Sequence, residues 1–340
     1  MEKRKDLMSS SNETITAISG IAVGHVTDKQ NATGVTVIRF AGDGVTAAVS
    51  VQGAAPGTRE TDLLEPGNLV DKVHAIVLAG GSAYGLDAAS GVMAALEGEG
   101  QGLAVLPGVV VPIVPAAVLF DLAIGSSKIR PTSEWGKQAV DDASLEPVKS
   151  GNLGAGTGAT VGKLAGPMFA TKGGLGSALL RLPDGTKVAA LVAVNAVGEI
   201  VNSATGAVIA GVRGSEKGAY RSAVDIAMGL SDGQGPIGSN TTIGIVVTDA
   251  PLTKADLKKV AEMGHDGFAR AIRPVHTQFD GDALFAVSTA TTDKNAEEAL
   301  NSAPNLNSIG VAAARVVELA ILDAVTAAES LSGCVASRDW

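Results

Sequence analysis

The sequence predicts an α+β fold in which mixed, largely antiparallel sheets are covered by helices. Pairs of apolar segments joined by Gly-containing turns are typical of β-hairpins, and other segments carry apolar residues at a helical period. Because the hairpins are flanked by helical runs, layered sheets are expected rather than a doubly wound sheet. The chain shows no internal repeat or low-complexity linker, so residues 1–340 are expected to form a single domain.

The first apolar segments, 35–40 and 45–51, are predicted to be consecutive strands of one hairpin. The turn Gly42-Asp43-Gly44 between them is a hairpin signature. A further strand is expected at 74–79, where the turn Gly80-Gly81-Ser82 leads into a helix. That helix keeps its apolar period at Leu86, Ala89, Met93 and Leu96.

Residues 103–124 are apolar enough to suggest a membrane span. Several prolines and Gly108 would break a spanning helix, so we expect a buried core segment interrupted by turns, and no membrane partner. The prolines are Pro107, Pro112 and Pro115.

The second half of the chain contains the clearest hairpin, with strands at 175–182 and 188–195 around the turn 183–186. A strand is expected after Thr241 and another at 283–289. Between them, the cap-like sequence 253–256 predicts the start of a helix. A second, alanine-rich helix is expected at 311–331.

Composition narrows the possible partners. The net charge of −9 and the pI near 5.0 argue against a nucleic-acid partner, because phosphate binding requires a clustered basic surface. Residues 1–14 are charged and then rich in Ser and Asn, without the apolar stretch of a secretory signal, so a cytoplasmic location is expected. Small-molecule or peptide chemistry is favoured.

The run 238–247, Gly-Ser-Asn-Thr-Thr-Ile-Gly-Ile-Val-Val, is the most informative segment. A glycine-rich loop ends in Asn240-Thr241 and passes directly into a strand. If the chain is cut there, Thr241 becomes a terminal residue with a nucleophilic hydroxyl and an α-amine, whose reference pKa is about 7.7–8.0. One residue could then attack an amide without a separate base. The alternative is an ordinary polar turn before a strand.

Two carboxylates and a lysine support the first interpretation. Asp280 and Asp282 are two residues apart at the entry of a strand, so in extended backbone they project to the same face. Such a pair could hold an ammonium group and a hydroxyl, although a solvated Asp-Gly turn would look similar. Lys163 lies in a glycine-rich loop, either as an exposed side chain or as a buried cation that tunes the pair.

Other motifs fit less well. Residues 154–164 resemble a phosphate-binding loop, but their spacing is not that of a P-loop and a dinucleotide fingerprint would need glycine at Ala159. Ser82 follows a strand as in a nucleophile elbow, yet Gly80-Gly81-Ser82-Ala83 misses the GxSxG spacing and no histidine is placed near it by the sequence.

The four histidines are scattered and show no metal-ligand spacing, so each is expected to be a surface or capping residue and no metal is predicted. They are His25, His74, His265 and His276.

Five motifs together resemble the N-terminal-nucleophile amide hydrolases that include the DmpA aminopeptidase, the β-aminopeptidases and the nylon-oligomer (aminohexanoate-oligomer) hydrolases. The motifs lie at 53–62, 78–87, 111–121, 240–244 and 276–282, and the resemblance covers nearly the whole chain.

The resemblance implies an αββα sandwich, assembled as a tetramer of cleaved protomers. Self-cleavage between Asn240 and Thr241 would give fragments 1–240 and 241–340, which remain associated. Thr241 would be the nucleophile. Of the other catalytic residues, Asn195 would donate to the oxyanion, Lys163 would support the site, and Asp280 and Asp282 would orient Thr241. No cofactor is implied, and substrate contacts are expected at Phe120, Gly81 and Ser82.

Two departures bear on the substrate. Members of this group place a tyrosine where this chain has Phe120, and the β-aminopeptidases have Ser and Glu where Asp280 and Asp282 stand. The resemblance therefore favours short peptides or ω-amino-acid oligomers such as aminohexanoate oligomers. A DmpA-type aminopeptidase is the alternative, and a protein that binds small molecules without turnover is a third.

Overall fold

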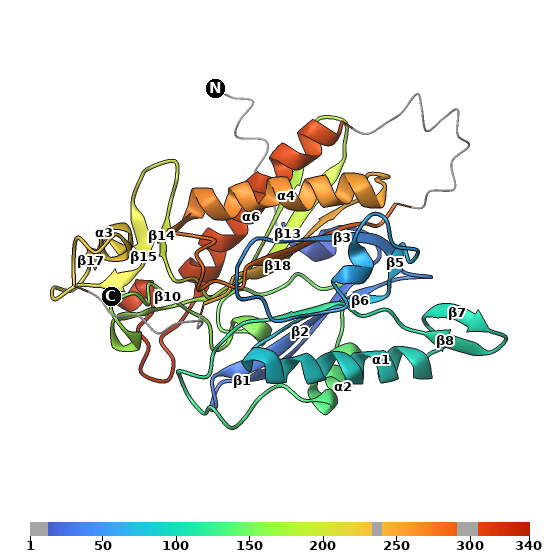
Figure 1. Cartoon of the computed structure of the whole chain (residues 1–340), viewed down its shortest axis with the longest axis horizontal. Helices are drawn as coiled ribbons and strands as arrows, with labels where there is room; N and C mark the ends of the chain where they lie inside the picture. The colour runs from blue at the N-terminus through green and yellow to red at the C-terminus, as the bar shows by residue number, and fades with distance from the viewer. Residues whose placement is uncertain (1–12, 233–239, 291–304) are drawn as a thin grey trace.

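The computed structural model describes residues 13–232, 240–290 and 305–340. Two sheets lie face to face, and a pair of helices covers the outer face of each (Figure 1). The predicted α+β sandwich is confirmed. No helix in the described ranges has the length and apolar character needed to cross a membrane.

The six-stranded sheet carries the segment around Thr241. Its order is β12-β13-β18-β20-β3-β5, and only the β18–β20 pair is parallel. The strands are β12 (Gly174–Arg181), β13 (Lys187–Val194), β18 (Ile243–Thr248), β20 (Ala283–Ser288), β3 (Val45–Val51) and β5 (Lys72–Val73). The hairpin predicted at 175–195 is confirmed as β12–β13.

The five-stranded sheet has the order β1-β2-β6-β9-β4, with one parallel pair, β6–β9. Its strands are β1 (Ile21–Asp28), β2 (Thr33–Phe40), β6 (Ala75–Ala79), β9 (Ala116–Val118) and β4 (Thr58–Arg59). Both sheets are therefore mixed and largely antiparallel, as expected.

The hairpin predicted from 35–40 and 45–51 is wrong. Both segments are strands, but β2 pairs with β1 and β6, whereas β3 pairs with β20 and β5 in the other sheet. The turn at 42–44 carries the chain from one sheet to the other. Gly44 has a φ of +87° and lies so close to Val73 that a Cβ would be 2.5 Å from its carbonyl oxygen, which explains the glycine there.

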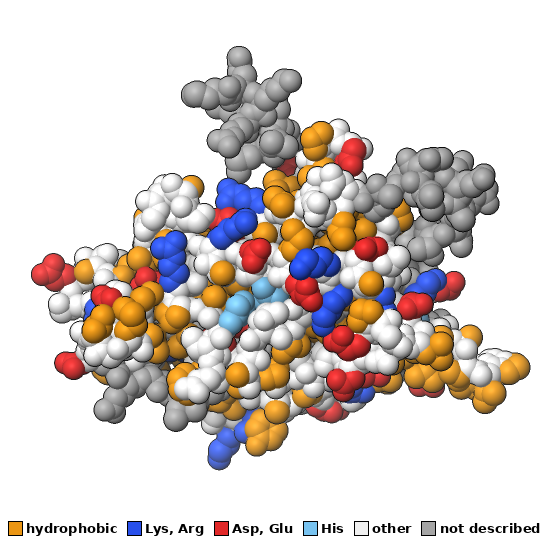
Figure 2. Space-filling view, turned by 45° about the horizontal axis from the view of Figure 1, so that its top comes forward, with side chains coloured by type: hydrophobic (Ala, Val, Ile, Leu, Met, Phe, Trp, Pro, Cys, Tyr) orange, Lys and Arg blue, Asp and Glu red, His pale blue; other side chains and the backbone are white. Residues whose placement is uncertain are grey.

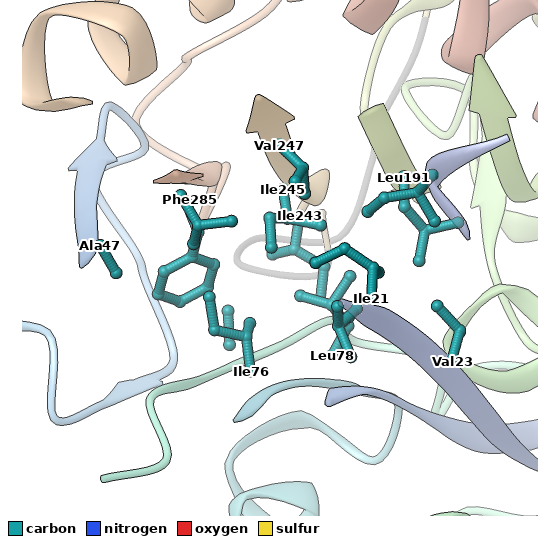
Figure 3. Close-up of a cluster of buried hydrophobic side chains, with 14 of the residues drawn as sticks. Ile21, Val23, Ala47, Ile76, Leu78, Leu191, Ile243, Ile245, Val247 and Phe285 are labelled. Carbon is teal, nitrogen blue, oxygen red and sulfur yellow. The ribbon is translucent and has the colours of Figure 1, made fainter. Parts of the chain in front are cut away.

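Three apolar layers hold the sandwich together. The central layer lies between the sheets, where side chains from β1 and β6 meet those of β18 and β20, among them Ile21, Leu78, Ile245 and Phe285 (Figure 3). One outer layer packs the six-stranded sheet against α4 (Lys254–Ala271) and α6 (Leu306–Ala327). The other packs the five-stranded sheet against α1 (Ala88–Gly98) and α2 (Ser133–Asp141).

Helix α4 begins as the sequence predicts. Thr253 is the N-cap, and its hydroxyl and the Asp256 carboxylate form a reciprocal capping box. The alanine-rich helix α6 is also present, although it begins at Leu306 and ends at Ala327, earlier than expected.

The prediction that 103–124 is a buried core segment is correct only for its second half. β9 is buried, but β7 (Leu103–Leu106) and β8 (Val109–Val111) form a hairpin whose apolar side chains are exposed. The hairpin projects from the body in Figure 1, and Figure 2 shows hydrophobic side chains gathered at that end of the molecule. The turn at Gly108 closes a local hairpin that has no sheet to join.

Candidate active site

Thr241 lies at the buried entry to the central strand β18. Its backbone N–H donates to the Asn195 carbonyl at 3.0 Å, and the preceding Asn240 carbonyl accepts from Gly281 N–H at 3.0 Å. The Thr241 hydroxyl donates to the same Asn240 carbonyl at 2.5 Å. The predicted nucleophile is therefore beside the carbonyl of the predicted cleavage site.

Gly281 makes room for this arrangement. A Cβ on Gly281 would lie 2.7 Å from the Thr241 hydroxyl oxygen and 2.6 Å from the Ala55 carbonyl oxygen, both closer than side-chain carbons are found. The glycine between the two aspartates is thus required by close approach, in addition to any turn it forms.

Asp280 and Asp282 lie just before β20, which runs parallel to β18, and both are buried. Asp282 Oδ1 accepts from Thr242 N–H at 2.7 Å. Asp280 Oδ2 accepts from the backbone N–H and the hydroxyl of Thr277, at 2.8 and 2.6 Å. Burial and the adjacent Asp282 charge raise the pKa of Asp280 to about 6. The carboxylates therefore lie beside the start of β18, where Asp282 holds the backbone of Thr242.

Lys163 is buried, so of the two possibilities that the sequence left open, an exposed side chain or a buried cation, the second is correct. Its Nζ donates to the Asn195 carbonyl at 3.0 Å and to Asn195 Oδ1 at 2.8 Å. Burial lowers the pKa of Lys163 to about 7, while the Asp280 charge opposes that shift. Because the same Asn195 carbonyl also accepts from Thr241 N–H, one peptide group connects Lys163 to Thr241.

Asn195, the predicted oxyanion donor, is fully buried at the end of β13. Its Oδ1 accepts from Thr160 N–H at 3.0 Å as well as from Lys163, and its Nδ2 donates to the Phe120 carbonyl at 3.0 Å. These partners fix the orientation of the amide, with nitrogen toward Phe120 and oxygen toward Lys163.

The three predicted substrate-binding residues separate in the structure. Phe120 lines a small cavity together with Lys163, Thr160, Gly158 and Pro167. Gly81 and Ser82 do not line this cavity. Gly81 N–H donates to the buried Asp121 carboxylate at 2.7 Å, and Ser82 N–H donates to the Leu119 carbonyl at 2.9 Å, so they hold the residues on either side of Phe120.

The rival motifs have structural explanations. Each histidine ring is hydrogen-bonded to a residue other than Ser82. His25 bonds to Thr36, His74 to Ile113, and His265 and His276 to each other. In the loop 154–164, Gly158 approaches Ala32 so closely that a Cβ would be 2.0 Å from its carbonyl oxygen. Tight packing accounts for that glycine without a phosphate.

The expectation that each histidine is a surface or capping residue is wrong for His74 and His265, which are buried. His265 Nδ1 and His276 Nε2 are 3.2 Å apart, and His276 Nδ1 is 2.8 Å from Asp282 Oδ2. His265 lies in α4, and His276 lies eleven positions later, in the connection between α4 and β20. No metal-ligand spacing in the sequence pairs residues this far apart. The sequence offered one signal for this contact, because His276 is the first residue of the motif 276–282, which contains both aspartates. Across the described ranges, no three His, Cys, Asp or Glu side chains gather as a metal site.

Known proteins place the chain in a family. The sequence model of peptidase family S58 matches residues 13–338. An uncharacterized aminopeptidase of Mycobacterium leprae is 42% identical, with 96% of this chain and 94% of that protein aligned. A 6-aminohexanoate-oligomer endohydrolase of Paenarthrobacter ureafaciens is 33% identical over 90% of this chain and 84% of that protein.

Two solved structures share the fold. The L-aminopeptidase D-Ala-esterase/amidase of Ochrobactrum anthropi, described as a variant of the Ntn hydrolase fold, has a TM-score of 0.68 at 21% identity and covers 97% of this chain and 91% of its own. A Burkholderia β-aminopeptidase has a TM-score of 0.67 at 20% identity, covering 98% and 94%. The sandwich is thus the Ntn hydrolase fold. The chain belongs to peptidase family S58, and the predicted class of amide-bond hydrolase is confirmed.

Proposed function

We propose that the chain cuts itself between Asn240 and Thr241 and that Thr241, as the new terminal residue, hydrolyses amide bonds. The observation that carries this proposal is the contact between the Thr241 hydroxyl and the Asn240 carbonyl at the buried entry of β18. A hydroxyl in that position is within reach of the carbonyl carbon of its own peptide bond. The products would be the fragments 1–240 and 241–340.

In maturation, the Thr241 hydroxyl oxygen attacks the Asn240 carbonyl carbon. The C–N bond breaks, the nitrogen takes up the hydroxyl proton, and an ester joins Asn240 to the Thr241 side chain. Water then hydrolyses the ester, which leaves a carboxylate on Asn240 and a free amine on Thr241. Gly281 N–H already donates to the attacked carbonyl oxygen at 3.0 Å, so it supports the charge that develops there.

In turnover, the free amine accepts the hydroxyl proton while the hydroxyl attacks a substrate amide. Asn195 would donate from Nδ2 to the oxyanion, in place of the Phe120 carbonyl that it contacts in the uncut chain. Lys163 would supply positive charge behind Asn195, and Asp280 and Asp282 would hold the terminal residue. An oxyanion donor contributes about 2.7–4 kcal/mol where it has been measured.

The proposed substrates are short peptides or ω-amino-acid oligomers. The endohydrolase of aminohexanoate oligomers among the relatives supports the second class, and the Phe120 side chain offers an apolar wall without a hydroxyl. A DmpA-type aminopeptidase is the second candidate, supported by the mycobacterial relatives that are named aminopeptidases. Amino-acid amides, β-peptides and aminohexanoate oligomers, assayed side by side, distinguish the two.

We also propose that the cleaved protomers assemble as a homo-oligomer, a tetramer by resemblance. The exposed apolar side chains of the β7–β8 hairpin support an association surface. Light scattering of the eluted protein measures the assembly directly.

The decisive experiment separates the two fragments on a denaturing gel and sequences their amino ends. Wild-type protein should give a fragment that begins Thr-Thr-Ile-Gly, and Thr241→Ala should stay uncut and inactive. Thr242→Val is the matched control, because the neighbouring Thr242 hydroxyl is buried without a hydrogen-bond partner in the described structure. An active wild type that remains one uncut chain contradicts the proposal.

A further inference from the structure

A continuous chain of hydrogen bonds runs from Thr242, directly before β18, to Ser50 in β3, which lies two strands away in the same sheet. It begins at Thr242 N–H, which donates to Asp282 Oδ1 at 2.7 Å, and passes from Asp282 Oδ2 to His276 Nδ1 at 2.8 Å. His276 Nε2 then meets His265 Nδ1 at 3.2 Å, and His265 Nε2 meets the Ser50 carbonyl at 3.0 Å. Every link is within hydrogen-bond distance.

The last link determines where the protons are. A carbonyl only accepts, so His265 Nε2 must carry a proton toward Ser50. Burial lowers the pKa of His265 to about 4, so its ring is neutral and its Nδ1 is a bare acceptor. His276 Nε2 must therefore donate to His265.

His276 Nδ1 faces the Asp282 carboxylate, which leaves two arrangements of one proton. Either His276 carries it and is an imidazolium, or Asp282 carries it and donates. Asp282 Oδ2 also accepts from His276 backbone N–H at 3.3 Å, while Oδ1 accepts from Thr242. Two backbone N–H donors directed at the two oxygens of this carboxyl group favour the ionised carboxylate, which places the shared proton on His276 as an imidazolium.

The backbone at His276 is held in an unusual conformation that makes these contacts. His276 has a φ of +55°, in the left-handed region that residues with a side chain seldom occupy. This conformation brings both the backbone N–H and the ring Nδ1 to the same oxygen of Asp282. Strained backbone of this kind is retained where the surrounding structure requires it.

We propose that His276 is a positioning residue that carries protons on both ring nitrogens, keeps Asp282 ionised and compensates its charge beside the terminal Thr241. The inference rests on the proposed function. The charged groups around this pair are Asp280 on the same segment, Lys163 across the site and Asp266 on α4, next to His265.

The charge on His276 affects how tightly the Thr241 α-amine, the base in turnover, holds its proton. A negative charge near the Thr241 amine stabilises its protonated form, and the imidazolium offsets one such charge. If His276 loses its charge while Asp282 stays ionised, the amine holds its proton to higher pH. The acid limb of kcat/KM then moves upward.

The test compares the pH profiles of wild type and His276→Asn, each as the cleaved enzyme. Asparagine tolerates positive φ and can donate to Asp282, but it carries no charge. The acid limb should move up by about one pH unit. His25→Asn, in a neutral histidine on β1 that contacts Thr36, is the matched control and should leave the limb in place. A uniform loss of rate with an unmoved limb overturns the proposal.

A second measurement uses the wild type alone and so does not depend on the variant folding. Solid-state NMR of protein labelled with ring-¹⁵N histidine should show, among only four histidines, one ring protonated on both nitrogens at pH 7.5. A spectrum with four neutral rings overturns the proposal. Failure of the proposed function looks different, because Thr241→Ala would then retain activity.

Discussion

Two buried lysines on neighbouring segments, Lys163 and Lys172, are alike in burial but differ in the groups that they contact. Burial lowers the pKa of Lys163 to about 7 and that of Lys172 to about 8. By burial and by direction of shift the two are alike. Their partners differ.

Lys172 Nζ donates to three backbone carbonyls, those of Gly156, Ala159 and Gly173, at 3.1, 2.8 and 2.9 Å. Two of these carbonyls, those of Gly156 and Ala159, belong to the glycine-rich loop 154–164, so the lysine fixes the path of that loop. Lys163 Nζ instead donates to Asn195, whose carbonyl also holds Thr241 N–H, and its largest favourable charge partner is Asp280. A lowered lysine pKa therefore marks burial, and the partners decide the role.

The largest contrast is expected in Lys163→Met. Loss of the cation behind Asn195 should lower turnover by about 10²- to 10³-fold, the size seen when one electrostatic donor is removed. Folding should hold, because Asn195 Oδ1 keeps Thr160 N–H and its carbonyl keeps Thr241 N–H. Steady-state kinetics and a thermal melt measure the two effects. Activity within threefold of wild type would place Lys163 outside the mechanism.

Lys172→Met should give the opposite result. Leaving buried carbonyls short of a donor should lower the free energy of unfolding by about 2–3 kcal/mol. Turnover per folded molecule should change little. Urea unfolding in the uncut Thr241→Ala background measures the loss, and a stable variant with no activity would contradict the structural role.

Asp280→Asn tests the charge that separates the two lysines. Removing a carboxylate beside the Thr241 amine destabilises the protonated amine, so the acid limb of kcat/KM should move to lower pH, with kcat lowered about 10-fold. Because the pKa of Asp280 is about 6, the shift should be seen above that pH. Asp184→Asn, in the exposed turn 183–186, is the control and should not move the limb.

The last prediction concerns the dependence of stability on pH, where the change expected for each lysine within one pH unit is small. Below pH 7 both lysines are protonated in the folded and the unfolded chain, so their contribution is constant. Between about pH 8 and the ordinary lysine value of 10.5, the unfolded chain binds more protons than the folded one. The free energy of unfolding should then rise by about 1 kcal/mol per pH unit for each lysine. Denaturant titrations of uncut Thr241→Ala measure the slope, and Lys172→Met should reduce it.

Local signals predicted well wherever the partners are close in the sequence. The β12–β13 hairpin and the Thr253 capping box depend on residues within one turn or one helix end. The prediction of a hairpin at 35–51 is wrong because β2 and β3 each form their backbone hydrogen bonds with strands from elsewhere in the chain. A turn signature cannot reveal that its two strands belong to different sheets.

The residues of the candidate site also fall into two groups: those that neighbouring residues in the sequence reveal, and those that only tertiary contacts reveal. Thr241 before a strand, and Asp280 and Asp282 two residues apart, were recognisable because the backbone period alone places them. The sequence left open whether Lys163 is buried, and it gave no reason to connect His265 with Asp282. Those relations depend on the parallel pairing of β18 with β20 and on the packing of α4.

The sequence by itself determined the layered α+β class and the family, and it predicted the segment that would carry the nucleophile, because apolar period and short motifs are properties of neighbouring residues. Only the tertiary structure decided which lysine lies against Asn195 and which charged groups lie close to one another. Desolvation and hydrogen bonding act between atoms a few ångströms apart in space, and residues as distant as Lys163 and Asp280 meet only when the sheets are assembled.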